Sequence, residues 1–240
     1  MRRLPRRGVV RFALWTALLV VLTALVQARL FATLDEPFLW FIAAHRPLAL
    51  TEAMNWFFRL GYVQVDAIVA LIAAAYLLIA RQSALAALAP LVLFAAIGVQ
   101  GGLRLVIKQP SAESAFAIRR VTVSQTAVSS VDRADATVRQ TLSAASATLG
   151  ASAQEQGSYP SGHACRALFL ALLARNELGQ LKKPKSWRVR QVLLSLLVLL
   201  AGLVGYSAMF FGYHWPSDVL AGYLLALMMF EVARCLTYGA

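Results

Sequence analysis

The chain has 240 residues, of which 60% are hydrophobic and only 14% are charged, and its mean hydropathy is +0.66. A soluble domain is closer to half apolar and a quarter charged, so this composition excludes an ordinary water-soluble protein. The formal net charge is +12, but the Lys and Arg residues cluster at the ends of apolar runs, which indicates bilayer topology rather than a nucleic-acid-binding face. Cys165 and Cys235 lie in apolar segments and imply no disulfide framework. The composition predicts one integral membrane domain over residues 1–240.

The first apolar run covers about residues 9–30 and follows a strongly basic start. It is long enough to cross a bilayer and has no clear small-residue cleavage site, so it predicts a retained anchor rather than a signal peptide. Residues 34–60 mix aromatic and charged side chains, which favours a segment lying in the membrane interface. We interpret His45, in this segment, as an interfacial histidine without a partner motif.

Further apolar runs predict membrane-spanning helices at about residues 63–80, 85–107, 162–178, 191–212 and 217–237. The run at 162–178 is the weakest, because Arg166 and Arg175 interrupt it. The expected fold is an all-α bundle of six spans, with both termini on the same side of the membrane. Basic residues concentrate on that side, so the positive-inside rule makes it cytoplasmic. They are Arg2, Arg3, Arg6, Arg7, Arg11, Arg81, Lys182, Lys183, Lys185, Arg188 and Arg190.

A polar stretch at residues 111–159, rich in Ser, Thr, Ala and Gln, separates the third and fourth predicted spans. We interpret it as an extracytoplasmic insertion, either a solvated loop or a short helical hairpin. The alternative is a lid over a binding site, since long loops next to functional motifs often close over them. Residues 1–62 then form an N-terminal anchor and interfacial segment, and residues 63–240 form the core.

Two short motifs, at residues 160–163 and 214–218, hold two of the three histidines of the chain. Membrane spans rarely carry titratable groups without a functional reason, although a pair of solvated interfacial histidines is the alternative. In the first motif, the free N–H groups of a helix start favour phosphate binding, and His163 can donate a proton to a leaving oxygen. In the second, Asp218 can fix the tautomer of His214, so that the opposite ring nitrogen attacks phosphorus. By the orientation above, both motifs face the extracytoplasmic side of an inner (plasma) membrane.

These motifs resemble those of the type 2 phosphatidic acid phosphatase superfamily, whose fold is shared with vanadium haloperoxidases. The second motif of the family, PSGH, is intact at residues 160–163, and the third matches Ser207, His214 and Asp218. The resemblance implies that His214 forms a phosphohistidine, that Asp218 orients it and that His163 is the general acid. It implies no metal and no other cofactor. The phosphate-binding candidates are Ser161, Gly162, Arg104, Lys108, Arg166 and Ser207.

The chain departs from the family pattern at two arginines. Ala208 stands at the arginine position of the third motif. The first motif, K-x6-RP, aligns best with Arg104 at its lysine, which places Ser111 and Ala112 at the RP pair; Pro110 and Lys108 keep part of its character. A second registration begins at Lys108 and places Ala115 and Phe116 at the RP pair. Removing charge stabilisation of this kind commonly costs orders of magnitude in rate.

Another arginine could compensate for this loss. Arg166 follows His163 by three residues on the same helix face, so it could reach a bound phosphate. The alternative is that its long side chain reaches out to the membrane interface. Further candidates lie in the polar insertion, namely Arg119, Arg120, Arg133 and Arg139.

The sequence thus predicts a metal-independent phosphatase that hydrolyses a phosphomonoester or diphosphate of a membrane lipid. Phosphatidate, phosphatidylglycerophosphate, lipid A and polyprenyl diphosphate are all compatible substrates. One alternative is a phosphotransferase, in which a lipid or sugar hydroxyl replaces water. The other is a catalytically impaired family member that binds phospholipid head groups or serves as a partner subunit. The expected partners are the lipid substrate and the bilayer, and no nucleic acid.

Overall fold

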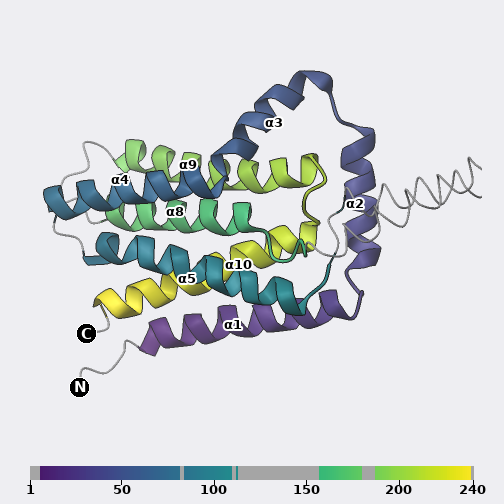
Figure 1. Cartoon of the computed structure of the whole chain (residues 1–240). Helices are drawn as coiled ribbons and strands as arrows, with labels where there is room; N and C mark the ends of the chain where they lie inside the picture. Colours follow the sequence, from purple (N-terminus) through teal and green to yellow (C-terminus); the bar gives the residue numbers. More distant parts are fainter. Residues whose placement is uncertain (1–5, 82–83, 110–111, 113–156, 180–186, 239–240) are drawn as a thin grey trace, which may run out of the picture.

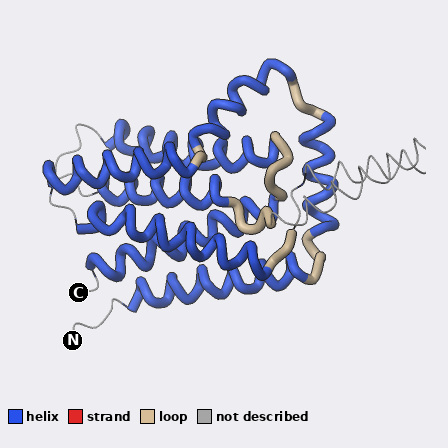
Figure 2. The backbone as a smooth tube through the Cα atoms, in the orientation of Figure 1, coloured by secondary structure: helices blue, strands red, loops and turns tan. Residues whose placement is uncertain are grey.

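A computed structural model describes residues 6–81, 84–109, 112, 157–179 and 187–238, and this part of the chain is helical with short connections (Figure 2). Helices α1, α4, α5, α8, α9 and α10 run side by side, whereas α2 crosses one end of the bundle and α3 leads from it back to α4 (Figure 1). We refer to the end crossed by α2 as the α2 end. The helices are α1 (Arg6–Gln27), α2 (Ala32–Ala44), α3 (Leu48–Leu60), α4 (Val63–Arg81), α5 (Ala84–Val106), α8 (Gly162–Gly179), α9 (Trp187–Phe210) and α10 (Pro216–Tyr238).

Four of the described helices, α1, α5, α9 and α10, are long and apolar enough to cross a membrane. Helices α3 and α4 make a fifth candidate if they count as one span, bent by 57° at the break between them. Large apolar side chains on the outer faces are exposed, such as Ile72 on α4 and Phe94 on α5. The chain is therefore a multi-pass membrane protein, and the count of six spans stays a prediction.

Helix α8 does not belong to the set of apolar candidates, and its position explains why. It packs against α4, α5, α9 and α10, so protein rather than lipid surrounds much of it. Its buried residues include the charged Arg166 and Glu177. Charged groups inside a membrane protein are tolerated where they face the bundle interior. The low hydropathy at residues 162–178 thus marks an interior helix.

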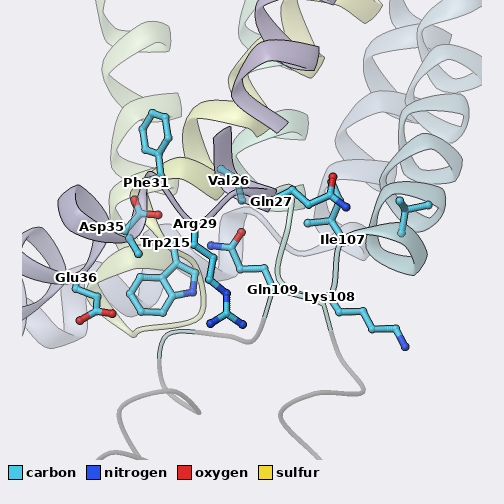
Figure 3. A pocket seen from close by; sticks show the side chains of 12 residues that line it. Val26, Gln27, Arg29, Phe31, Asp35, Glu36, Ile107, Lys108, Gln109 and Trp215 are labelled. Atoms are coloured by element: carbon cyan, nitrogen blue, oxygen red, sulfur yellow. The ribbon is translucent and has the colours of Figure 1, made fainter. Parts of the chain in front are cut away.

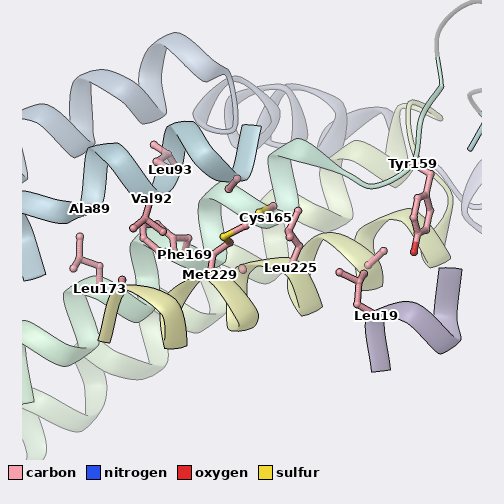
Figure 4. Close-up of a cluster of buried hydrophobic side chains, with 14 of the residues drawn as sticks. Leu19, Ala89, Val92, Leu93, Tyr159, Cys165, Phe169, Leu173, Leu225 and Met229 are labelled. Carbon is pink, nitrogen blue, oxygen red and sulfur yellow. The ribbon is translucent and has the colours of Figure 1, made fainter. Parts of the chain in front are cut away.

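The main core lies where α8 and α10 meet α1 and α5 (Figure 4). Phe169 of α8 is 1% exposed and packs in one cluster with Val92 of α5 and Leu225 of α10. Lipid tails are as apolar as these side chains, so close packing rather than removal from water holds such helices together. Cys165 lies in this cluster and is unpaired, as its apolar surroundings in the sequence indicated.

The first helix is shorter than its apolar run, because α1 ends at Gln27 rather than near residue 30. Arg29 adopts a φ of 58°, and the Leu30 N–H donates to the Leu25 carbonyl at 3.0 Å. This is a helix-terminating motif that usually places glycine at the left-handed position. The predicted interfacial segment then forms two helices, α2 and α3, with Pro47 preceding α3. The tight turn at Arg29 thereby directs α2 across the end of the bundle.

The orientation of the bundle is testable by labelling single cysteines at its two ends. Glu52 lies on α3 at the α2 end and Arg188 lies at the start of α9, and both side chains are exposed. In a background lacking Cys165 and Cys235, we expect an impermeant thiol reagent to label Glu52→Cys in intact cells and Arg188→Cys only after lysis. The reverse labelling would place the α2 end in the cytoplasm and contradict the positive-inside assignment.

Candidate active site

The two histidine motifs meet at the α2 end of the bundle. The Ser161 N–H donates to the backbone carbonyl of Asp218 at 2.9 Å, and the ring centroids of His163 and His214 lie 6.1 Å apart. Gly222 permits this approach, because a Cβ there would overlap the Ser161 carbonyl oxygen. The structure therefore brings together residues that are about fifty positions apart in the sequence.

His214 is held by the short loop between α9 and α10. Gly212 has a φ of 76°, a conformation that side chains other than glycine adopt only with strain. The Ala208 carbonyl accepts the N–H groups of Tyr213 at 3.0 Å and His214 at 3.3 Å. These contacts close the loop and leave His214 6% exposed at the mouth of the bundle.

Asp218 faces His214 from the first turn of α10. Its Oδ2 lies 3.5 Å from Nδ1 of His214 and accepts the Trp215 N–H at 3.0 Å, and the carboxylate is fully buried. The distance to His214 exceeds a normal hydrogen bond. Catalytic hydrogen bonds are often long without substrate and shorten in the complex, so this arrangement suits an orienting carboxylate.

His163 occupies the first turn of α8 within an aromatic cluster. Its ring stacks on Phe58 with centroids 4.5 Å apart and meets the edge of Tyr62 at 5.9 Å. A Cβ at Gly61 would overlap the His163 ring and lie 2.9 Å from Val204. The break between α3 and α4 at Gly61 therefore makes room for the imidazole.

Three buried polar atoms of this cluster lack a hydrogen-bond partner within the described part of the chain. They are Nε2 of His163, Nδ1 of His214 and Oδ1 of Asp218. Folded proteins rarely leave buried polar groups unsatisfied, and functional sites are a common exception. Together with the free N–H groups at the start of α8, these atoms indicate a site for a polar, anionic ligand.

Arg104 is the best placed of the predicted phosphate-binding cations. It interacts electrostatically with this cluster, and within the described residues it forms no ion pair with a carboxylate. It lies in the last turn of α5, is exposed, and interacts electrostatically with both Asp218 and His163. Lys108 is also exposed, but it lines a separate cavity of about 390 Å³ that includes Trp215.

Arg166 is buried and does not reach the membrane interface, so that alternative is wrong. Its Nε donates to Asp66 Oδ2 at 2.8 Å, its Nη2 donates to the Gly61 carbonyl at 2.6 Å, and it is 4% exposed. Its Nη1 lies against Gly162, where a Cβ would be only 2.5 Å away. The guanidinium thus ties the start of α8 to α4 and to the Gly61 break.

The serine hydroxyls of the motifs form hydrogen bonds with the backbone of their own helices. Ser161 accepts the Ala164 N–H at 3.4 Å and caps α8, and Ser207 donates to the Val204 carbonyl at 2.7 Å. Both residues are fully buried. The remaining candidates lie outside the described residues: Pro110, Ser111, Ala115, Phe116, Arg119, Arg120, Arg133 and Arg139.

The sequence interpretation missed two buried carboxylates that lie next to the site. Asp66 pairs with Arg166, and a lone carboxylate at the start of an apolar run was a signal for such a partner. Asp35 is 3% exposed and accepts two hydrogen bonds from Ser217. Burial raises the pKa of Asp35 above its ordinary value, whereas the bonds from Ser217 act in the opposite direction.

Comparison with known proteins assigns the family. The model of the PAP2 superfamily matches residues 110–239, which is more than half of the chain. The chain belongs to the PAP2 superfamily. The crystal structure of a transmembrane PAP2-type phosphatidylglycerolphosphate phosphatase from Bacillus subtilis is similar, with a TM-score of 0.66 and 19% sequence identity over 93% of this chain and 94% of that chain. No curated protein sequence matches the chain. Helices α1 to α5 lie before the match to the PAP2 model, and because the structural similarity covers 93% of this chain, most of this N-terminal part belongs to the shared fold.

Removal of Arg104 tests which cation serves the site of this PAP2 protein. We expect Arg104→Ala to lower kcat about 100-fold, in line with the loss of one preorganised charge donor, and Lys108→Ala to change it less than about threefold. Turnover of a lipid phosphate by purified protein in micelles measures both. Equal losses in the two variants would contradict the distinction drawn from their positions.

Proposed function

We propose that this member of the PAP2 superfamily is a lipid phosphatase that cleaves a phosphomonoester or diphosphate of a membrane lipid through a phosphohistidine. The observation that carries the proposal is the juxtaposition of the His163 and His214 rings, whose centroids lie 6.1 Å apart, with unsatisfied polar atoms on both rings and on Asp218. Asp218 beside His214 supplies the third member of the arrangement.

In the first step, Nε2 of His214 attacks phosphorus, and an N–P bond forms as the bond to the lipid oxygen breaks. His163 must carry a proton for this step, and it gives that proton to the leaving oxygen, so that a neutral alcohol or a lipid phosphate departs. Asp218 stabilises the positive charge that develops on His214. In the second step, water attacks phosphorus, His163 accepts its proton, and the N–P bond breaks to release inorganic phosphate and neutral His214.

The phosphoryl oxygens need positive charge throughout this reaction. The N–H groups at the start of α8 supply part of it, and Arg104 supplies a full charge from the end of α5. Arg166 is neutralised by Asp66, so its contribution is to hold the start of α8 in place. With the roles divided in this way, the site does not depend on an arginine at position 208. Ala208 is fully buried, and its carbonyl closes the His214 loop.

A groove beside the site supports a lipid as the substrate. It has a volume of about 740 Å³, is almost wholly apolar, and runs between α4, α8 and α9. One end includes Leu60 and Val204, next to Gly61 and His163, and the other end includes Glu177. The groove follows α8 from Ala167 to Leu178, which is about 17 Å at 1.5 Å per residue. Because His163 protonates the leaving group, a tail in this groove would place the lipid oxygen beside the acid.

Filling the far end of the groove tests this assignment. Ala174 lines the groove three turns of α8 beyond His163, so a larger side chain there leaves the histidines untouched. We expect Ala174→Trp to raise KM about tenfold or more for a long-chain phosphatidate and to leave a short-chain phosphatidate unaffected. Leu71→Trp, on the exposed face of α4, is the matched control. An equal effect on both chain lengths would contradict a tail site.

The phosphotransferase and the impaired-binder alternatives need a different comparison. Purified protein is incubated with a panel of lipid phosphates, with and without EDTA and with added alcohols as acceptors. Phosphate release that survives EDTA supports the metal-independent phosphatase, and transfer to the alcohol instead supports the phosphotransferase. Binding of lipid phosphates without turnover across the panel would favour the impaired family member.

A further inference from the structure

The N-terminal helices, which precede the match to the PAP2 model at residues 110–239, contact the motif at residues 214–218 and the residue just before the PSGH motif. In α1, the Thr23 hydroxyl lies 2.7 Å from the hydroxyl of Tyr159, the residue that precedes the PSGH motif. In α2, Asp35 contacts Ser217, which lies inside the motif at residues 214–218. The segment that the sequence indicated as an anchor therefore supports the site directly.

Of these two contacts, that of Asp35 is closer to the proposed catalytic residues, because Ser217 directly precedes Asp218. Its Oδ1 accepts the Ser217 N–H at 3.0 Å and its Oδ2 accepts the Ser217 hydroxyl at 2.5 Å, with the carboxylate 3% exposed. Ser217 is in the first turn of α10, whose N–H groups have no partner within the helix. A carboxylate at this position satisfies one of these groups and interacts favourably with the helix dipole.

Ser217 lies between the residues that Asp35 would control. Asp218 follows it directly, and its backbone carbonyl accepts the Ser161 N–H of the other motif. Trp215 precedes it by two residues, donates its N–H to the Asp218 carboxylate, and lies beside Asp35 on the wall of the same cavity (Figure 3). A shift of Ser217 would therefore move Asp218 relative to both His214 and the start of α8.

We propose that Asp35 is a positioning residue, which fixes the first turn of α10 so that Asp218 faces His214. Asp35 does not touch the reacting atoms in this account and acts through Ser217. The proposal rests on the proposed function for its kinetic consequence, but the placement of the His214 ring follows from the fold alone.

The kinetic test uses substitutions at both ends of the contact. We expect Asp35→Ala to lower kcat about 10- to 100-fold with KM within about twofold, because small misplacements of catalytic groups have effects of this size. Asp35→Asn keeps one acceptor oxygen, so its kcat should fall less than that of Asp35→Ala. The fall in kcat for Ser217→Ala should be similar to that for Asp35→Asn. The kcat of the double variant Asp35→Asn/Ser217→Ala should be no lower than that of the worse single variant, because both substitutions act through one contact. Glu52→Ala, which removes an exposed carboxylate from α3, is the control.

The structural test is nitrogen NMR of the histidine side chains in the full chain, which needs no substrate. In the wild type we expect His214 to carry its proton on Nδ1, facing Asp218, with His45 as an internal reference. Both Asp35→Ala and Ser217→Ala should shift the His214 signals toward a mixture of tautomers and leave those of His45 unchanged. Unshifted His214 signals in both Asp35→Ala and Ser217→Ala would overturn the proposal, whatever happens to kcat. Shifted signals in a protein that hydrolyses no phosphate would support the positioning role and reject the proposed function.

Discussion

Replacement of His214 by alanine is expected to lower kcat for a lipid phosphate by about 10⁴-fold or more. Loss of a covalent nucleophile removes the pathway through the phosphohistidine, and residual turnover then rests on binding and electrostatics alone. His214 is also the histidine that Asp218 faces at 3.5 Å. Phosphate release by purified protein, measured over a range of lipid concentrations, gives the change in kcat.

The matched control for this substitution is His45→Ala. His45 is exposed at the end of α2, and its Nδ1 bonds the Phe41 carbonyl at 2.9 Å. Its replacement should leave kcat within about twofold, because surface substitutions away from a site have small effects. Substantial activity in His214→Ala would assign the attack on phosphorus to another group.

Replacement of His163 by alanine is expected to have an effect that depends on the leaving group. For a lipid phosphate, whose alkoxide leaves poorly, we expect kcat to fall about 10²- to 10⁴-fold, the usual contribution of general acid catalysis. For p-nitrophenyl phosphate, whose leaving group needs no proton, the loss should be less than about tenfold. The ratio of the two losses isolates proton transfer from any general damage to the site.

Arg104→Ala provides the comparison for this ratio. Arg104 offsets phosphoryl charge in our account and does not touch the leaving oxygen, so its removal should slow both substrates by the same factor. Equal losses for both substrates in His163→Ala would mean that His163 holds the phosphate and is not the acid.

The sequence alone was enough to single out candidate site residues where polar or charged side chains stand in apolar segments. Histidines and carboxylates in membrane segments are costly, so the residues at 163, 214 and 218 drew attention without a structure. Hydrophobic runs also predicted the long helices closely, for example α5 at Ala84–Val106 against an expected 85–107. Both signals are local, and local signals survive in a single sequence.

Contacts between residues far apart in the chain could not be predicted from the sequence. The sequence leaves Arg166 either at the phosphate or at the membrane interface, and Asp66, one hundred positions earlier, decides against the interface by holding the guanidinium in the interior, against Gly162. Asp35 lay in a segment of mixed composition, where a charged residue ordinarily indicates solvent rather than a bond to Ser217. The hydropathy of α8 reflects the helices around it rather than its own path through the bilayer.

The proposed mechanism requires that His214 becomes covalently phosphorylated during turnover. It is tested most directly by quenching the purified protein within milliseconds of mixing with a ³²P-labelled lipid phosphate and mapping the label. We expect a label on the peptide that contains His214, stable to alkali and lost in acid, as is typical of an N–P bond. The His163→Ala variant should keep this label longer than the wild type, because the same histidine accepts the proton of the attacking water. Turnover without any protein-bound label, or a label that maps elsewhere, would contradict the account.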